Sequence, residues 1–222
     1  MAIILNLETA TTNCSVSISR KGQLLALIEE NSASYSHSEQ LHKFIEQGLE
    51  KAGLTIDQLD AVAVSKGPGS YTGLRIGVST AKGLCYALDI PLISVDTLRS
   101  MASSIDIQDG YILPLLDARR MEVYAAVYDH QHKELKKTWA EIIQEESFRE
   151  FMNGKALYLI GSGAEKCKDV LKSPDIKFNA EIIPTARTLA ALSYEKYKAG
   201  EFENTAYFEP FYLKDFIIAR PK

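Results

Sequence analysis

The chain lacks several features that would place it in a specialised class of protein. Its three cysteines, Cys14, Cys85 and Cys167, stand far apart without a C-x-x-C pair. This spacing argues against a disulfide framework or a zinc site and is typical of buried thiols in a reducing compartment. No apolar run reaches 18 residues, and the segment before Glu8 has no basic start. We therefore expect neither a membrane span nor an export signal, and a cytoplasmic protein.

An excess of basic residues is also absent. The net charge of −4 and the pI near 5.7 argue against a protein that binds nucleic acid unaided, because such binding needs clustered Lys and Arg. The basic groups, Arg119 with Arg120 and Lys133 with Lys136 and Lys137, are small and lie near acids. If RNA is involved, we expect another subunit to carry most of the contact. The 46% of hydrophobic residues are sufficient for an ordinary globular core.

The order of hydrophobic patterns predicts a mixed α/β fold. Alternating apolar residues predict three strands at 3–8, 14–20 and 24–30. A helix follows, begun by Ser36-x-x-Glu39 in capping-box spacing and ended at Gly53. A strand at 61–65, a helix to Leu88 and a strand at 91–95 complete the first series.

A similar series then starts again. The segment 111–129 predicts two strands, and further segments predict a strand at 134–139, a helix at 146–152, a strand at 156–161 and helices at 163–171 and 185–198. Two series in similar order indicate a duplicated α/β unit. We therefore predict two halves, 1–105 and 106–222.

The stretch KGPGSYTGLRIG at 66–77 joins a predicted strand to a predicted helix. No G-K-[ST] follows it, so it is not a Walker A motif, and the spacing Gly67-x-Gly69-x-x-x-Gly73 is one residue too long for a dinucleotide fingerprint. Backbone amides here could cradle a phosphate, or a hydroxyl side chain could simply cap the helix. The possible phosphate loop comprises Gly67, Gly69, Ser70, Tyr71 and Thr72.

The helix after this stretch has small residues every four positions, at Gly73, Gly77 and Ala81. Each helical glycine costs about 1 kcal/mol relative to alanine, so close packing should offset the loss. The helix also has apolar residues on two faces, whereas a surface helix needs one. The second face must be covered by the 37–52 helix or by another protein.

Three carboxylates, Glu8, Asp96 and Asp117, each end a predicted strand. Together they could hold magnesium for phosphoryl transfer or phosphodiester cleavage, or they could be acids where strands meet water. His37 and His42 are five residues apart and do not form a metal pair on a helix, and no serine stands in a G-x-S-x-G elbow. An enzyme with its own carboxylate or nucleotide site therefore stays a rival hypothesis.

Several motifs together resemble one known family. NLETATTNCSVSI, SHSEQL, VSKGPGSYTGLRIGVSTAKGL, LLDARRMEVYAAVYD and EPFYL are similar to the TsaB (YeaZ) family, the small glycoprotease-like paralogues of the Kae1/TsaD group. The resemblance covers nearly the whole chain, although it is thin between Gly163 and EPFYL. It implies an actin-like ATPase (ASKHA) fold of two RNase H-like halves. It also implies a part in making threonylcarbamoyladenosine beside the anticodon of tRNA.

The resemblance further implies a non-catalytic subunit that pairs with a TsaD-like paralogue, is joined by a TsaE-like ATPase, and meets tRNA indirectly through the complex. The paralogue carries its metal on H-x-x-x-H, where this chain has Thr97 and Met101. Neither is a competent ligand for iron or zinc, so we expect no metal and no catalytic residue. Glu8 and Ala10 replace the Asp and Gly of nucleotide-binding relatives, so we expect no cofactor, with weak nucleotide binding left open.

From the resemblance and the small residues we predict that the helices 37–52 and 72–88 form the face offered to the TsaD-like partner. When that partner is absent, the same face is expected to form a homodimer. The predicted partner-binding residues are Leu41, Phe44, Ile45, Gly73, Leu74, Gly77, Thr80, Ala81 and Leu84.

Overall fold

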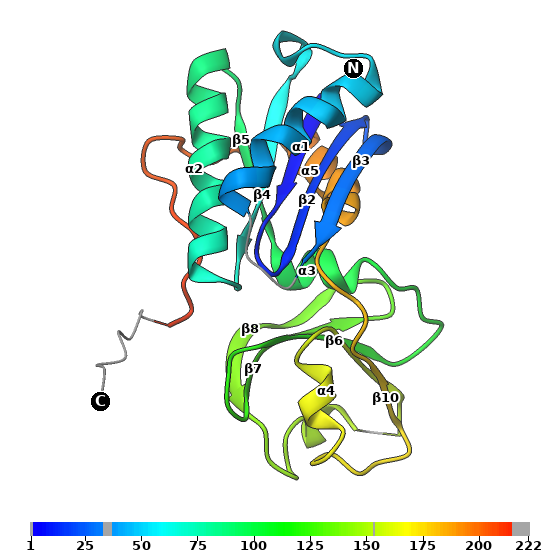
Figure 1. Cartoon of the computed structure of the whole chain (residues 1–222). Coiled ribbons are helices and arrows are strands. Elements are labelled where there is room, and N and C mark those ends of the chain that lie inside the picture. Colours follow the sequence, from blue (N-terminus) through cyan, green and yellow to red (C-terminus); the bar gives the residue numbers. More distant parts are fainter. Residues whose placement is uncertain (1, 33–36, 153, 215–222) are drawn as a thin grey trace, which may run out of the picture.

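Two five-stranded sheets, one above the other, form the framework of the protein (Figure 1). The computed structural model describes residues 2–32, 37–152 and 154–214. The first sheet has the order β3-β2-β1-β4-β5, and the second has β10-β9-β6-β7-β8. In each sheet the first three strands form an antiparallel meander, and the last two are added in parallel.

The first sheet consists of β1 (Ile3–Glu8), β2 (Asn13–Arg20), β3 (Gln23–Asn31), β4 (Ala61–Gly67) and β5 (Leu92–Asp96). The second consists of β6 (Tyr111–Asp117), β7 (Glu122–Asp129), β8 (Glu134–Ile142), β9 (Leu157–Ile160) and β10 (Ile176–Asn179).

The duplication predicted from element order is confirmed by this shared strand order. If the five strands of each sheet are numbered in sequence order, their spatial order, starting from the edge strand of the meander, is third, second, first, fourth and fifth. The strands are rich in β-branched and apolar residues, and in β1, β2 and β4 nearly every side chain is buried. Strands covered on both faces have this composition because neither face meets water.

Helices cover the first sheet on both faces. α1 and α2 lie on one face and α5 on the other (Figure 1). Leu41, Phe44 and Ile45 of α1 belong to the same core cluster as Val16 and Ile18 of β2. The helices are α1 (His37–Ala52), α2 (Tyr71–Leu88), α3 (Thr97–Ala102), α4 (Ala164–Cys167) and α5 (Ala186–Ala199), with 3₁₀ turns η1 (Ile56–Gln58) and η2 (Arg149–Phe151).

The two halves exchange their last helices. α3 follows the first sheet in sequence, yet its Leu98 and Met101 pack against Ile112 and Tyr128 of the second sheet. α5 follows the second sheet, yet Leu189 packs against Val95 in the first. The predicted boundary near residue 105 separates the strands of the two sheets but not the packing units. The predicted halves 1–105 and 106–222 each hold one sheet, although each sheet buries an apolar face under a helix from the other half.

The short elements differ most from the sequence prediction. The helix predicted at 146–152 is only the 3₁₀ turn η2, because Phe148 has a left-handed backbone that stops an α-helix. The helix predicted at 163–171 shortens to α4, since the Lys168 and Val170 amides that follow bond three residues back in tight turns. β10 and α3 were not predicted. The predicted capping residue Ser36 lies outside the described residues.

Candidate functional site

The glycine stretch forms the turn between β4 and α2, and a serine side chain caps the helix there. Ser70 Oγ accepts a hydrogen bond from the Gly73 amide at 3.3 Å. The Ser70 amide itself donates to the Ala10 carbonyl at 2.7 Å. Capping satisfies helix amides that would otherwise need a ligand or water. The helix cap predicted as one interpretation of this stretch is therefore present at the Gly73 amide, and the possible phosphate loop stays a prediction.

Small residues of α2 bring its backbone against the loop that joins β1 to β2. A Cβ atom added at Gly69 would collide with the Ala10 carbonyl, and one added at Gly73 would collide with the Thr9 carbonyl. A Cβ at Gly77 would collide with Thr9 Oγ1. That hydroxyl donates to the Gly73 carbonyl at 2.8 Å. The close approach predicted from the glycine spacing is therefore present, and its partner is a loop of the same chain.

The structure places most of the predicted partner-binding residues inside the molecule. Thr80 and Leu84 are half-buried and keep part of their surface outside. The other predicted residues are buried within the molecule and cannot present their side chains to a partner, because the first sheet and the β1–β2 loop already cover them. The buried residues are Leu41, Phe44, Ile45, Gly73, Leu74, Gly77 and Ala81.

One strip of the exposed surface of α2 carries no charge and lies beside the exposed Arg75 and Tyr86. The residues of this strip recur at helical spacing and are small or uncharged, and a Cβ atom added at Gly83 would have nothing within 4 Å. We call this surface the α2 outer face. It comprises Thr72, Ile76, Ser79, Thr80, Gly83 and Ala87, of which Ile76 and Thr80 are half-buried.

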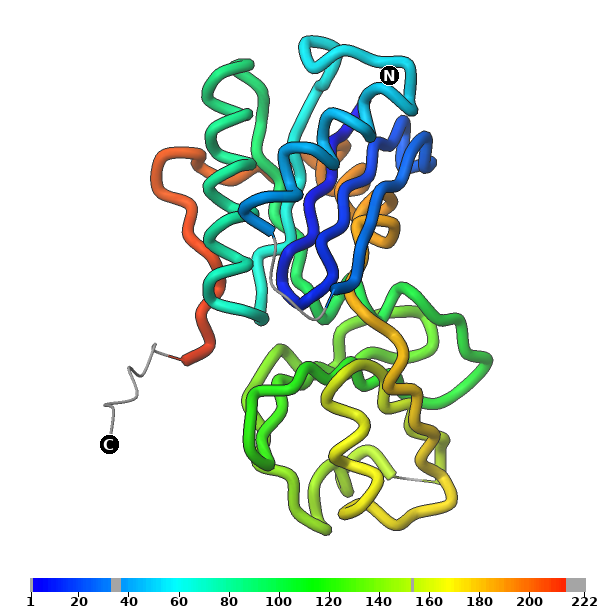
Figure 2. The backbone as a smooth tube through the Cα atoms, in the orientation of Figure 1, coloured from blue at the N-terminus to red at the C-terminus, as the bar shows by residue number. Residues whose placement is uncertain are grey.

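The segment after α5 runs beside α2 and reaches the glycine turn, as the tube in Figure 2 shows. Lys82 donates to the carbonyls of Ala206 and Phe208 at 3.2 and 3.0 Å. The Phe211 amide donates to Lys66, and the ring of Tyr212 lies 4.9 Å from that of Tyr71. The predicted phosphate loop thus has a carbonyl of the β1–β2 loop on one side and this C-terminal segment on the other.

Glu8 lies at the end of β1, and no part of it is exposed. Its Oε1 accepts from the Ala10 amide at 2.7 Å. Burial raises the pKa of Glu8 to about 7, and hydrogen bonds from Ala10 and Ser65 oppose that rise. The side chain is therefore shielded from solvent and largely neutral below pH 7.

The structure does not bring the three strand-end carboxylates together. Asp96 lies 3.3 Å from Lys66, and Asp117 of the second sheet bonds to Lys166 at 2.6 Å. Within the described ranges, no three His, Cys, Asp or Glu side chains gather as metal ligands do. The two positions where the resembling paralogue has its histidines, Thr97 and Met101, are fully buried in α3. Thr97 Oγ1 is 2.6 Å from Ser65 Oγ.

Two of the four histidines contact backbone carbonyls. His37 Nε2 lies 2.6 Å from the Thr11 carbonyl, and burial lowers the pKa of His37. It thereby ties the start of α1 to the same β1–β2 loop that α2 contacts. His132 Nε2 lies 3.0 Å from the Ile105 carbonyl. These contacts connect segments of the fold, and a neutral ring suffices for them.

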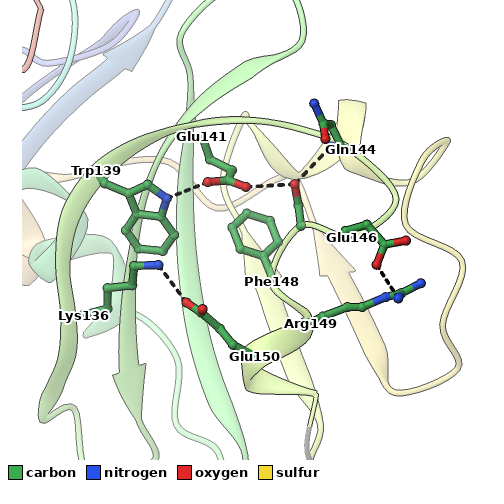
Figure 3. Close-up of a pocket in the computed structure, with 9 residues that line it drawn as sticks. Lys136, Trp139, Glu141, Gln144, Glu146, Phe148, Arg149 and Glu150 are labelled. Carbon is green, nitrogen blue, oxygen red and sulfur yellow. Dashed lines mark hydrogen bonds and ion pairs between the residues drawn. The ribbon is translucent and has the colours of Figure 1, made fainter.

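A cavity of about 380 Å³, which we did not predict, lies beside β8 and η2 in the second half (Figure 3). Trp139 Nε1 donates to Glu141 at 2.8 Å, and Ser147 Oγ donates to the other oxygen of that carboxylate at 2.9 Å. The Lys136 ammonium lies 4.1 Å from the centre of the Trp139 ring and pairs with Glu150. The charged groups and the indole that line the cavity are thus engaged with one another.

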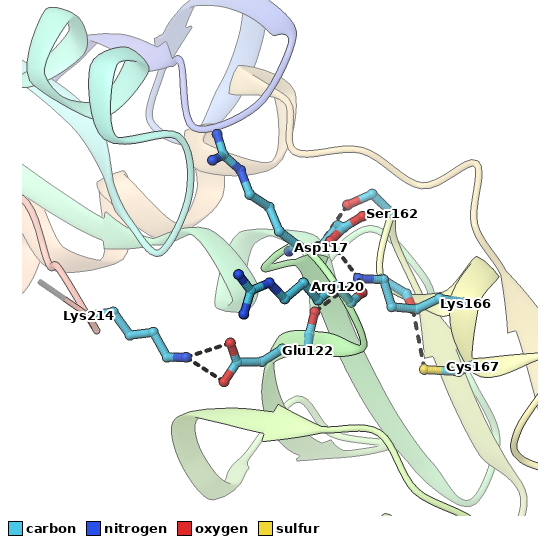
Figure 4. Close-up of polar contacts among 9 residues, drawn as sticks. Asp117, Arg120, Glu122, Ser162, Lys166, Cys167 and Lys214 are labelled. Atoms are coloured by element: carbon cyan, nitrogen blue, oxygen red, sulfur yellow. Dashed lines mark hydrogen bonds and ion pairs between the residues drawn. The ribbon is translucent and has the colours of Figure 1, made fainter. Parts of the chain in front are cut away.

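A lysine whose role the sequence did not predict holds the β6–β7 hairpin of the second half. Lys166 of α4 donates to Asp117 Oδ1 and to the carbonyls of Arg120 and Glu122 (Figure 4). The DARRMEVY motif marked the hairpin itself, but no local pattern links it to a lysine more than forty residues later. Only the tertiary fold places the two together.

Comparison with known proteins assigns the chain to a family. The model of the family TsaD, tRNA N6-adenosine threonylcarbamoyltransferase, matches residues 28–217. The chain belongs to this family. Within it, the chain groups with the TsaB/YeaZ proteins, as the motifs indicated. It is 28% identical to the tRNA threonylcarbamoyladenosine biosynthesis protein TsaB of Escherichia coli, over 96% of this chain and 94% of that protein.

Two solved structures from Pseudomonas aeruginosa share the fold of this TsaB/YeaZ family member. One is an uncharacterized protein with similarity to peptidase YEAZ, and the other is YeaZ. Their TM-scores are 0.84 and 0.81, each at 26% identity over 96% of this chain and all of the other. The predicted fold class, two RNase H-like halves in an actin-like arrangement, is confirmed. Among the described residues, no helix is long and apolar enough to cross a membrane.

Proposed function

We propose that the chain is a non-catalytic subunit that activates the synthesis of threonylcarbamoyladenosine in tRNA. It does so in the cytoplasm by binding a TsaD-like transferase, which a TsaE-like ATPase joins. The observation that carries this proposal is the similarity to TsaB of Escherichia coli over nearly the full length of both chains.

The geometry supports a role without catalysis. The loop that would cradle a phosphate is packed between the Ala10 carbonyl and residues 211–212. Glu8 at the end of β1 is sealed from solvent, Asp96 pairs with Lys66, and Asp117 lies in the other half. The rival hypothesis, a phosphoryl-transfer enzyme or nuclease with its own site, needs converging carboxylates that a substrate can reach. Micromolar binding of ATP and magnesium to the isolated chain would favour that rival.

The α2 outer face is the surface that we assign to the transferase. It is uncharged, it lies on a long helix held rigidly by the β1–β2 loop, and Gly83 in its middle lets another helix approach closely. A stable interface buries about 800 Å² on each partner, and this face with its surroundings on α1 could supply it. The same face would pair two copies of the chain when the transferase is absent.

The variant Gly83→Trp tests this assignment. A Cβ atom at Gly83 has nothing within 4 Å, and Gly83 borders a pocket between α2 and residues 204–206 that leaves room for the ring, so the melting temperature should not fall. Binding to the TsaD-like protein, measured by calorimetry, should weaken at least tenfold, and threonylcarbamoyladenosine in tRNA, measured by mass spectrometry, should fall. The control is Ala199→Trp, at an exposed position of α5 on the opposite face of the sheet. Normal binding by Gly83→Trp would refute the interface, and normal tRNA modification in cells without the chain would refute the function.

A further inference from the structure

Two adjacent arginines at the tip of the β6–β7 hairpin have a backbone that their residue type disfavours. Arg119 has φ of 70° and Arg120 has φ of 51°, and both are left-handed. Residues with a Cβ atom seldom adopt this conformation, which glycine and asparagine accept more easily. Non-glycine residues held in such conformations concentrate at functional sites. The hairpin therefore has two long cationic side chains at positions where glycine would adopt the observed backbone with less strain.

The hairpin that carries the arginines is rigidly held. Asp117 Oδ1 accepts the Arg119 amide at 2.6 Å, and Lys166 donates to the Arg120 carbonyl at 2.6 Å. Ser162 Oγ accepts the Asp117 amide at 3.2 Å from the loop before α4. In Figure 4 the Arg120 guanidinium points away from Lys166. A ligand would thus meet two cations on a fixed base and would not have to order a loop.

The charge of both guanidinium groups is available. Arg119 and Arg120 are exposed, and within residues 2–32, 37–152 and 154–214 neither guanidinium group forms an ion pair or hydrogen bond. The two nearby carboxylates are already engaged, Asp117 by Lys166 and Glu122 by Lys214. The sequence suggested that neighbouring acids offset this basic pair. The structure shows that those acids are paired with lysines instead.

We propose that Arg119 and Arg120 bind phosphate groups of the tRNA backbone in the assembled complex. A guanidinium group presents a planar fork of donors that matches a phosphate, and its charge persists at every physiological pH. The inference rests on the proposed function. An acidic protein could also bind two arginines, but we choose RNA because the relatives are named for a tRNA modification. It adds a direct contact to a chain whose net charge of −4 predicts that other subunits hold most of the RNA.

The test compares tRNA binding by the assembled complex with and without the two side chains. The variant replaces both residues by glycine, Arg119→Gly with Arg120→Gly, because glycine accepts the observed φ values. We expect the affinity for tRNA, measured by fluorescence anisotropy, to fall about tenfold, since two charge-assisted contacts are lost. The slope of log affinity against log salt should shrink in magnitude by roughly 1.5. The melting temperature of the variant should stay or rise, which a merely structural role of the side chains would not produce.

The control removes two other exposed cations of the second half, Lys133→Ala with Lys137→Ala. This control also removes two positive charges. Its affinity for tRNA should stay within about twofold of that of the unsubstituted complex. Assembly of the complex is measured separately by size-exclusion chromatography, and the glycine variant should assemble normally. Unchanged tRNA affinity and salt slope in an intact complex would overturn the proposal. So would equal loss in the control, or failure of the glycine variant to assemble, which would assign the arginines to a protein partner. If the unsubstituted chain formed no complex, the proposed function itself would fail.

Discussion

The two sheets share one strand order, but their coverings differ greatly. The first sheet lies between α1 and α2 on one face and α5 on the other, and its connections are long helices. The second sheet has α3 on one face, while its own connections shorten to the four-residue α4 and the 3₁₀ turn η2. The duplicated strands persist because their pairing and burial define each core. Connections outside the core can shorten without loss of the sheet.

The difference separates two kinds of surface. The first half presents a long, uncharged helix face, which suits close packing against another protein. The second half presents hairpins and loops with charged side chains, including Arg119 and Arg120, which have no ion pair within the described part of the chain. Duplication of one unit therefore supplied two dissimilar surfaces in one small chain.

The largest expected effect concerns the contact of α2 with the β1–β2 loop. Gly73→Leu forces a side chain into the Thr9 carbonyl, a backbone atom that cannot move aside, and should lower the free energy of unfolding by more than about 4 kcal/mol. The matched variant Gly83→Leu, on the same helix, places its Cβ where nothing lies within 4 Å and should raise it by up to about 1 kcal/mol. Urea unfolding measures both. Equal stabilities would mean that α2 does not depend on this contact.

The exchange of helices between the halves gives the next largest effect. Leu189→Ala in α5 and Leu98→Ala in α3 each empty a fully buried site and should cost about 3 to 4 kcal/mol. Hydrogen exchange should rise first in the first sheet for the α5 variant and in the second sheet for the α3 variant. Arg187→Ala, exposed on α5, serves as the control. Loss of protection in the sheet that precedes each helix in sequence would contradict the exchange.

Glu8 should make the stability of the first half depend on pH. Because burial raises the pKa of Glu8 from 4.5 to about 7, the folded chain holds a proton that the unfolded chain releases between those values. The contribution of the neutral carboxyl is complete below pH 4.5 and is lost as pH rises through 7. Glu8→Gln should therefore raise the free energy of unfolding at pH 8 by up to about 3 kcal/mol, with little change at pH 4.5. Denaturant unfolding at the two pH values tests this, and an equal effect at both would contradict it.

The smallest effect concerns the ion pair between the C-terminal segment and the second half. Lys214 pairs with Glu122, and their side chains are 47% and 19% exposed. Lys214→Met should lower the free energy of unfolding by less than about 1 kcal/mol, because water and salt screen such a pair. High salt should abolish the difference between the variant and the parent chain in thermal unfolding. A larger or salt-independent loss would show that the pair joins the two halves more firmly than its exposure indicates.

The sequence predicted the long elements well, for a physical reason. α1, α2 and α5 and the strands of both meanders show several repeats of their hydrophobic period, so the pattern identifies each element and its buried face. β10, α3 and α4 are four to six residues long and show at most two repeats. Tertiary contacts decide such short segments. The left-handed backbone at Phe148, which ended a predicted helix, has no signal in the residue type.

At the candidate site, too, the sequence pattern predicted a local feature but not the distant residues that contact it. The spacing of Gly73, Gly77 and Ala81 correctly indicated a helix face that another backbone approaches. It did not identify that backbone, because a missing side chain reveals space and not the neighbour that fills it. The neighbour is the loop at Thr9, some sixty residues earlier in the chain.

The sequence alone thus determined the family, the duplicated strand order and the presence of a closely packed glycine helix, since these depend on local periodicity and local motifs. The tertiary structure alone decided which surface remains outside, which helix covers which sheet, and that two arginines have no acidic partner among the described residues. Those features depend on contacts between residues far apart in the chain, and such contacts form only when the whole core is assembled.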